Sequence, residues 1–249
     1  MMTDALRNRK FQLFTILTRY QILAYGRSYY VQGLFLAAVL AGSGMVATGV
    51  RSDWLASEVV TWSSLFILLP VILLVSCVSS SVAFVSSEHF IWDHVLTRGI
   101  SRLSLFVSRS IALVAVGQGF VVCMLLLLAF FSLALVDDAG KDVHLLGVVR
   151  LYFLMLFLSI FVVGIAGGVS AAGAPPWVCI TSSLVAGSIV GYFIYFATGF
   201  DFTLINLVDS LGALVRGERS FPYVVIVIMS IISFGFQLAG NWRLTQRDF

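Results

Sequence analysis

Charge is scarce in this chain of 249 residues, of which only 11% are Asp, Glu, Lys or Arg while 60% are hydrophobic. A soluble domain has about 25% charged residues. Six long segments contain no charged residue: Tyr29–Val50, Val59–Val85, Ser110–Val136, Leu151–Ala174, Trp177–Phe200 and Phe221–Gly240. With these segments and the short connections between them, no room remains for a soluble domain.

Each uncharged segment is near or above the about 20 residues that a helix needs to cross a bilayer core. The segments are continuously apolar, whereas the strands of a membrane barrel alternate between apolar and polar residues. We therefore predict an all-α polytopic membrane protein with six transmembrane helices in a single domain, residues 1–249.

Cysteine and histidine are also few, with three of each. Cys77, Cys123 and Cys179 fall inside predicted spans at a spacing unlike a metal motif, so we expect small buried side chains and no disulfide. The three histidines, at positions 89, 94 and 144, fall in connections. The Gly-Ser-Gly at 42–44 therefore has no base nearby for serine protease chemistry.

A nucleotide-binding loop is missing as well. Gly140-Lys141 is a fragment of one, but Leu135 stands where the first glycine belongs and Asp142 follows the lysine. We therefore expect a chain that is not itself an enzyme, and that holds no cofactor and no metal.

The charges that are present lie on opposite sides of the predicted spans. Ten of the fifteen basic residues fall in the N-terminal arm, the second-to-third connection and the tail, whereas the other connections collect eight acidic residues. The positive-inside rule then places both termini in the cytoplasm. We expect these basic residues to contact lipid surfaces rather than nucleic acid.

The first 27 residues precede the spans and carry a weak amphipathic pattern. Leu6, Leu13 and Leu17 share one side of a helical wheel, and Asn8 and Gln12 lie on another. This pattern favours an interfacial amphipathic helix over residues 1–27. A frayed basic tail is the alternative.

Three polar residues inside the predicted spans are candidates for lining a pathway: Ser43, Ser80 and Gln118. Serines and amides in membrane helices also bond the preceding turn or a neighbouring helix. Packing is therefore the alternative for each of them. Pro70 is expected to kink the second span.

Two connections carry patterns of their own. Residues 87–102 combine apolar Phe90, Trp92 and Leu96 with polar neighbours, which predicts a short cytoplasmic amphipathic helix, and Ser101 is placed to cap the helix that follows. Residues 201–220 mix apolar and acidic residues, and we expect an external segment that can re-enter the membrane surface before the last span.

Together these features resemble the ABC-2 type permease family, the membrane subunits of type V ABC exporters. The resemblance rests on the interfacial N-terminal helix with six spans, and on two local patterns. One is Glu88 followed by the stretch Leu96-Thr97-Arg98-Gly99-Ile100-Ser101-Arg102, in which Gly99 replaces the proline of the family. The other is the tail Arg247-Asp248-Phe249.

The resemblance implies that the segment 87–102 is a coupling segment that docks on a separate ABC ATPase subunit. The residues expected at that contact are Glu88, Trp92, Asp93, Arg98 and Arg102. A solvated loop is the alternative. The resemblance also implies that the partner ATPase binds ATP and Mg, and that a second permease subunit completes a homo- or heterodimer in the inner membrane of a prokaryote.

Other functions explain the sequence less well. A non-transporting membrane scaffold, or an anchoring subunit of a larger complex, explains the spans but not the amphipathic segment between two of them. An ion-coupled transporter usually has ionisable residues inside its spans, and the six predicted spans have none. Uncharged spans favour an amphipathic or lipid-like cargo, a peptide or a drug over a highly charged solute.

Overall fold

The computed structural model of the chain describes residues 2–85, 101–135, 142–198 and 203–246. Within these ranges every regular element is helical and there is no strand, so the predicted all-α class is confirmed. The elements are α1 Met2–Gly26, α2 Tyr29–Arg51, α3 Ala56–Ser63, the π-helical turn η1 Ser64–Leu68, α4 Leu69–Val85, α6 Arg102–Leu135, α8 Leu145–Ala171, α9 Pro176–Thr198, α10 Leu204–Val215 and α11 Tyr223–Gln246.

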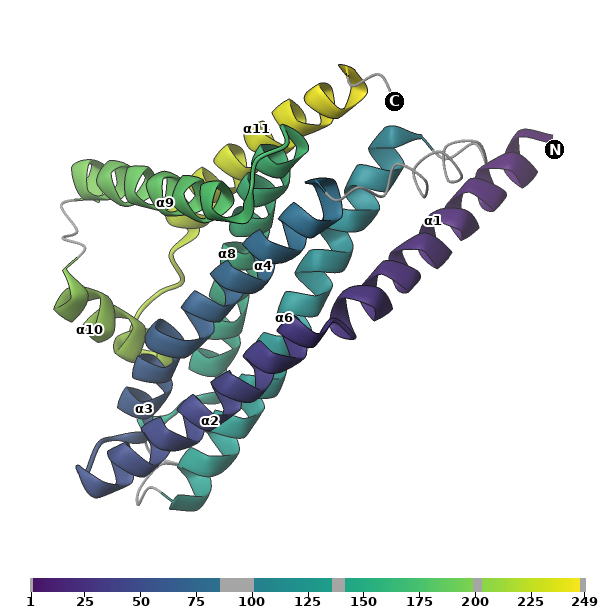
Figure 1. Cartoon of the computed structure of the whole chain (residues 1–249). Coiled ribbons are helices and arrows are strands. Elements are labelled where there is room, and N and C mark those ends of the chain that lie inside the picture. Colours follow the sequence, from purple (N-terminus) through teal and green to yellow (C-terminus); the bar gives the residue numbers. More distant parts are fainter. Residues whose placement is uncertain (1, 86–100, 136–141, 199–202, 247–249) are drawn as a thin grey trace.

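Five helical segments in the described part of the chain are long and apolar enough to cross a membrane: Tyr29–Arg51, Ala56–Ser81, Leu103–Phe130, Leu145–Ala171 and Tyr223–Arg243. The remaining predicted span falls on α9, Pro176–Thr198, which is not among these five. In Figure 1, α9 also runs in a different direction from α4. A helical membrane protein is therefore supported, whereas the count of six spans stays a prediction.

Both ends of the described chain, Met2 in α1 and Gln246 in α11, lie toward the same end of the bundle (Figure 1). The turn between α2 and α3 lies at the opposite end. This arrangement agrees with termini that share one side of a membrane. Which side that is follows only from the charge distribution and stays a prediction.

Helices α1 and α2 follow one another along α6 (Figure 1). Leu17 of α1 packs against an apolar cluster that includes Leu105 and Phe106 near the start of α6, and Ser108 donates a hydrogen bond of 3.2 Å to the amide oxygen of Gln21. The N-terminal segment is thus a helix, as predicted, and its packing partner is α6. Its place in a membrane interface stays a prediction.

Helix α6 is longer than the predicted third span. It begins at Arg102 rather than Ser110, because Ser101 caps it by accepting a hydrogen bond of 3.1 Å from the backbone N–H of Ser104. Its 34 residues make a helix about 51 Å long, against a hydrocarbon core of about 30 Å. Helix α6 is therefore longer than a bilayer core is thick.

Two arginines that the sequence placed in connections lie inside helices. Arg109 is in α6 and only 5% exposed. Arg150 is in α8, where its guanidinium donates hydrogen bonds to the carbonyl oxygens of Gly217 at 3.4 Å and Arg219 at 2.9 Å. The helices therefore extend beyond the uncharged segments and include a cation near each of these two boundaries.

Pro70 lies at a change in helix type. The turn before it, η1, is π-helical, and α3, η1 and α4 together form the span Ala56–Ser81. Proline has no N–H for the helix ladder, and its ring clashes with the carbonyl four residues earlier. A π-helical turn is one way for a helix to absorb such an interruption.

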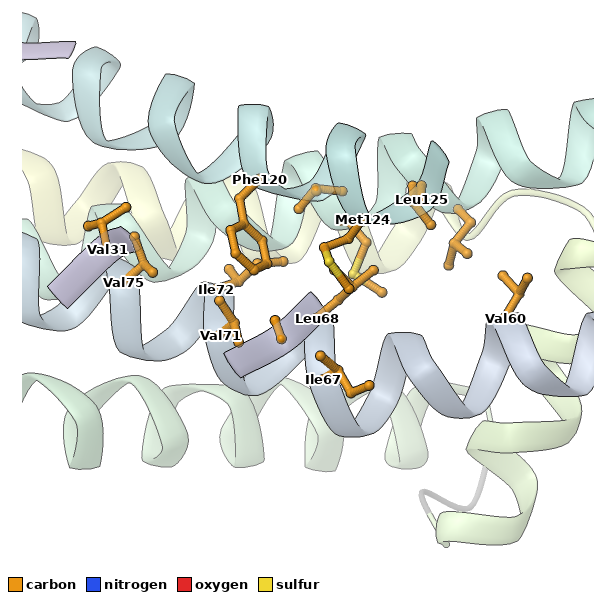
Figure 2. Close-up of a cluster of buried hydrophobic side chains, with 14 of the residues drawn as sticks. Val31, Val60, Ile67, Leu68, Val71, Ile72, Val75, Phe120, Met124 and Leu125 are labelled. Atoms are coloured by element: carbon orange, nitrogen blue, oxygen red, sulfur yellow. The ribbon is translucent and has the colours of Figure 1, made fainter. Parts of the chain in front are cut away.

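The core joins α2, the α3–α4 span and α6. Figure 2 shows Leu68 and Ile72 pointing toward Phe120 and Met124 of α6, with Val31 of α2 beside Val75. Phe120 also meets a ring of α2 edge to face, with 5.2 Å between the ring centroids. These apolar contacts fix α4 between two other helices.

Helix α10 is held against the start of α8. It begins after Thr203, whose hydroxyl accepts a bond of 3.4 Å from the N–H of Asn206. It ends at Val215, whose carbonyl accepts a bond of 3.3 Å from the N–H of His144. Only a glycine at position 147 admits this approach, because a methyl group there would overlap the carbonyl oxygen of Val215. Part of the segment 201–220 is thus a docked helix; its re-entry into the membrane stays a prediction.

Candidate functional site

A hollow of about 700 Å³ lies between α4, α8 and α9 in the described part of the chain, and Thr203 also lines it. Its apolar walls come from three helices: Leu69 and Leu73 of α4, Leu158, Phe161 and Val162 of α8, and Leu184 of α9. Since these residues fall near the middle of their helical segments, the hollow lies at about half the height of the bundle. Leu184 is 53% exposed, so the hollow opens on the surface of the protein.

Hydroxyl groups give the hollow its polar character. They belong to Ser183, Ser188, Tyr192 and Thr203, and no charged side chain is among the described lining residues. Ser183 is 4% exposed, and its oxygen lies 3.7 Å from the sulfur of Cys77. Ser188 donates to the carbonyl of Leu184 in its own helix at 3.0 Å.

A further group of polar contacts lies one helical turn from Ser183, at the contact of α4, α8 and α9. The sulfur of Cys179 is 3.1 Å from the hydroxyl of Ser170 and 3.4 Å from that of Ser81. Cys77 and Cys179 are buried, as the sequence predicts, whereas Cys123 is exposed on α6 and the prediction of burial is wrong there. All three are free thiols.

The side chains around the hollow are suited to bind an uncharged molecule. A Ser hydroxyl provides one donor and two acceptor positions, so Ser183 retains hydrogen-bonding capacity beyond its long contact with sulfur. Across the described residues, no group of three or more His, Cys, Asp or Glu side chains is arranged to hold a metal ion. The arrangement therefore supports binding of a largely apolar molecule with a hydrogen-bonding group.

The three predicted pathway residues lie in different places, outside the described lining of the hollow. Ser43 is exposed on α2 and bonds a carbonyl in its own helix. Gln118 donates a bond of 2.8 Å to Ser159 of α8, which is the contact between helices expected from packing. Ser80 is fully buried in α4, and its hydroxyl has no hydrogen-bond partner among the described residues. Their part in a pathway stays a prediction.

The predicted ATPase-coupling residues cannot be compared with the structure. Glu88, Trp92, Asp93 and Arg98 lie outside the described residues. Arg102 begins α6, but its side chain also lies outside the described part. The helices on both sides of the segment are described, and α4 and α6 contact each other through the core shown in Figure 2.

The sequence of α9 contains a repeat of small and polar residues that predicts one face of the hollow, although the segment as a whole is apolar. Cys179, Ser183, Gly187 and Gly191 recur every four residues along α9. This spacing places small and polar side chains on one helix face. Three of the four line the hollow, and Cys179 lies one helical turn before Ser183. A search for polar residues within spans would find Ser183. Gly187 and Gly191 are found only when the four-residue spacing is considered.

No family model and no curated protein matches the chain.

Proposed function

We propose that this chain is the permease subunit of an ATP-binding cassette exporter of the ABC-2 type. The observation that carries the proposal is the course of α4. This helix lines the hollow with Leu69 and Leu73 and ends at Val85, directly before the segment 87–102 that resembles a coupling segment. One helix therefore joins the expected ATPase contact to the candidate binding site.

The π-helical turn gives α4 a place to bend. Residues Ser64–Leu68 precede Leu69, the first residue of α4 and a lining residue of the hollow. π-helical turns are frequent at functional sites. A push on the Val85 end of α4 would then tilt the wall of the hollow about the turn, as in hinge motions between packed elements.

The other side of the coupling segment is anchored as well. Helix α6 begins at Arg102, and its first turns hold α1 through the apolar cluster of Leu105 that Leu17 packs against and through the bond from Ser108 to Gln21. A docked segment transmits force only if the helices on both of its sides are held. The contact between α1 and α6 provides that hold.

Three further parts of the proposal follow from the same resemblance. The ATPase activity, with its ATP and Mg, resides in the partner subunit. A second permease subunit completes the transporter, and the complex works in the inner membrane of a prokaryote. A cargo with a large apolar part suits the hollow that α4 lines.

A detergent pull-down of the tagged chain from its native host tests the proposal. We expect an ATPase subunit, recognised by its nucleotide-binding motif in mass spectrometry, to co-purify with the wild type. The double variant Trp92→Ala, Arg102→Ala should lose most of that ATPase. Arg51→Ala is the control, because Arg51 ends α2 at the opposite end of the bundle (Figure 1).

The result that would overturn the proposal is a monodisperse, folded wild type without any ATPase. A non-transporting scaffold would then be the better explanation, and the co-purified proteins would identify the complex that it anchors.

A further inference from the structure

We propose that the hollow between α4, α8 and α9 binds an uncharged amphipathic molecule, whose aliphatic body lies against Leu73, Phe161 and Leu184 and whose hydroxyl, carbonyl or amide group bonds Ser183. That such a molecule is the cargo rests on the proposed function. The binding itself does not, because every residue named here belongs to this chain.

The size and shape of the hollow suit a small molecule. Its volume of about 700 Å³ falls within the range of about 300–1,000 Å³ that is usual for ligand sites. Three helices form its walls, and Gly187 and Gly191 of α9 widen it. A methyl group placed on Gly187 would meet no atom within 4 Å, so this part of the hollow is open.

The lining determines the charge of the ligand. Leu69, Leu73, Leu158 and Phe161 present only carbon, and the polar lining groups are hydroxyls. A charged group at the middle of a bilayer is costly unless it meets an opposite charge or water. No described lining residue offers an opposite charge, so the ligand is uncharged where it meets the hollow.

The hydroxyl of Ser183 favours a ligand that has a hydrogen-bonding group in addition to its apolar part. Apolar contacts alone give little preference for a protein surface over lipid tails, because both are equally apolar. A hydrogen bond at this depth does discriminate. Ser183 is nearly buried and lines the hollow, and among the described residues its hydroxyl has one partner, the sulfur of Cys77 at 3.7 Å. Sulfur is a weak partner, so a ligand oxygen or N–H competes with it easily.

Photolabelling tests the site. The purified full chain, in nanodiscs of phosphatidylcholine, is exposed to a long-chain fatty alcohol and to the matching alkane, each with a diazirine in its chain. We expect saturable labelling by the alcohol on Phe161 and Leu184, displaced by excess unlabelled alcohol. The alkane should label the outside of the bundle without saturation.

Two variants locate the ligand. Gly187→Phe fills the hollow and should abolish the saturable labelling. Gly235→Phe is the matched control, because Gly235 of α11 also has open space around it but is not among the described lining residues. Ser183→Ala should weaken binding of the alcohol by about two- to tenfold, as expected for one lost hydrogen bond, and leave labelling by the alkane unchanged.

Labelling by the alcohol that does not saturate, or that is the same in wild type and Gly187→Phe, would overturn the inference. Size-exclusion profiles and thermal unfolding of each variant confirm that loss of labelling is not loss of fold, and Ser183→Ala remains a test if Gly187→Phe does not fold. The assay contains no ATPase. If labelling is saturable but no ATPase is found in the pull-down, the binding site is supported and the proposed exporter function is rejected.

Discussion

Helix α8 is packed in opposite ways on two of its sides. Toward α11 the two backbones nearly touch: a methyl group placed on Gly240 of α11 would lie 2.6 Å from the Cα of Gly168, and one placed on Gly168 would overlap the carbonyl of Phe236. Toward α9, Leu158 and Phe161 face a hollow of about 700 Å³. One helix therefore combines a close contact with α11, which we call the seam, with an open surface toward α9.

The difference depends on whether a second helix backbone lies against the glycine. Glycines four residues apart, Gly164 and Gly168, let α8 and α11 approach closely, and Ser233 donates a bond of 3.1 Å to the carbonyl of Ile160 across this seam. On α9, Gly187 meets nothing within 4 Å. The same residue type creates contact on one side of α8 and space on the other, depending on whether a partner helix is there.

The largest expected effect is on the seam. Gly168→Ala should lower the free energy of unfolding by about 2 kcal/mol or more, because its methyl group has no room beside the backbone of Phe236. Thermal unfolding followed by tryptophan fluorescence measures it. Gly235→Ala makes the same change in α11 where a methyl group meets nothing within 4 Å, and it should be neutral or stabilise by up to about 1 kcal/mol. Equal effects of the two variants would mean that the seam is not close-packed.

We expect a smaller change in the free energy of unfolding when a hydrogen bond between two helices is removed, and almost none when the bond lies within one helix. Ser233→Ala loses its bond to Ile160 across the seam and should cost about 0.6 kcal/mol, the average for such bonds in membrane proteins. Ser188→Ala removes a bond to Leu184 in its own helix at the hollow, and its cost should be near zero. A larger cost for Ser188→Ala than for Ser233→Ala would contradict the comparison.

Much of the fold follows from composition and length. The uncharged segments correspond to the helices α2, α3–α4, α8 and α11. Ser101 predicted the start of α6. These features are local, because each is determined by residues that are close together in the sequence.

The rest of the fold depends on contacts between distant segments. Nothing local in Gly147 shows that Val215 will lie against it. Nor does the sequence around Arg150 show that its guanidinium will bond the carbonyl oxygens of Gly217 and Arg219. Such pairings arise only when α10 docks on α8.

The hollow is also a product of distant contacts, because its walls come from three helices. Ser43, Ser80 and Gln118 were the visible candidates, since each is a polar residue in an apolar segment. Ser183 has the same local character, and only the arrangement of α4, α8 and α9 distinguishes it.

The most direct test of the central claim, that an ATPase moves the wall of the hollow through α4, is a pair of distances. Spin labels at Leu74 of α4 and Val185 of α9 report on the hollow, and labels at Phe153 of α8 and Phe234 of α11 report on the seam. Both pairs are placed in a background in which alanine replaces the three cysteines, in a complex purified with the ATPase that we propose as its partner.

On addition of a non-hydrolysable ATP analogue, we predict a changed distance between α4 and α9 and an unchanged distance between α8 and α11. An unchanged distance between α4 and α9, in a complex shown to have bound the nucleotide, would contradict the claim.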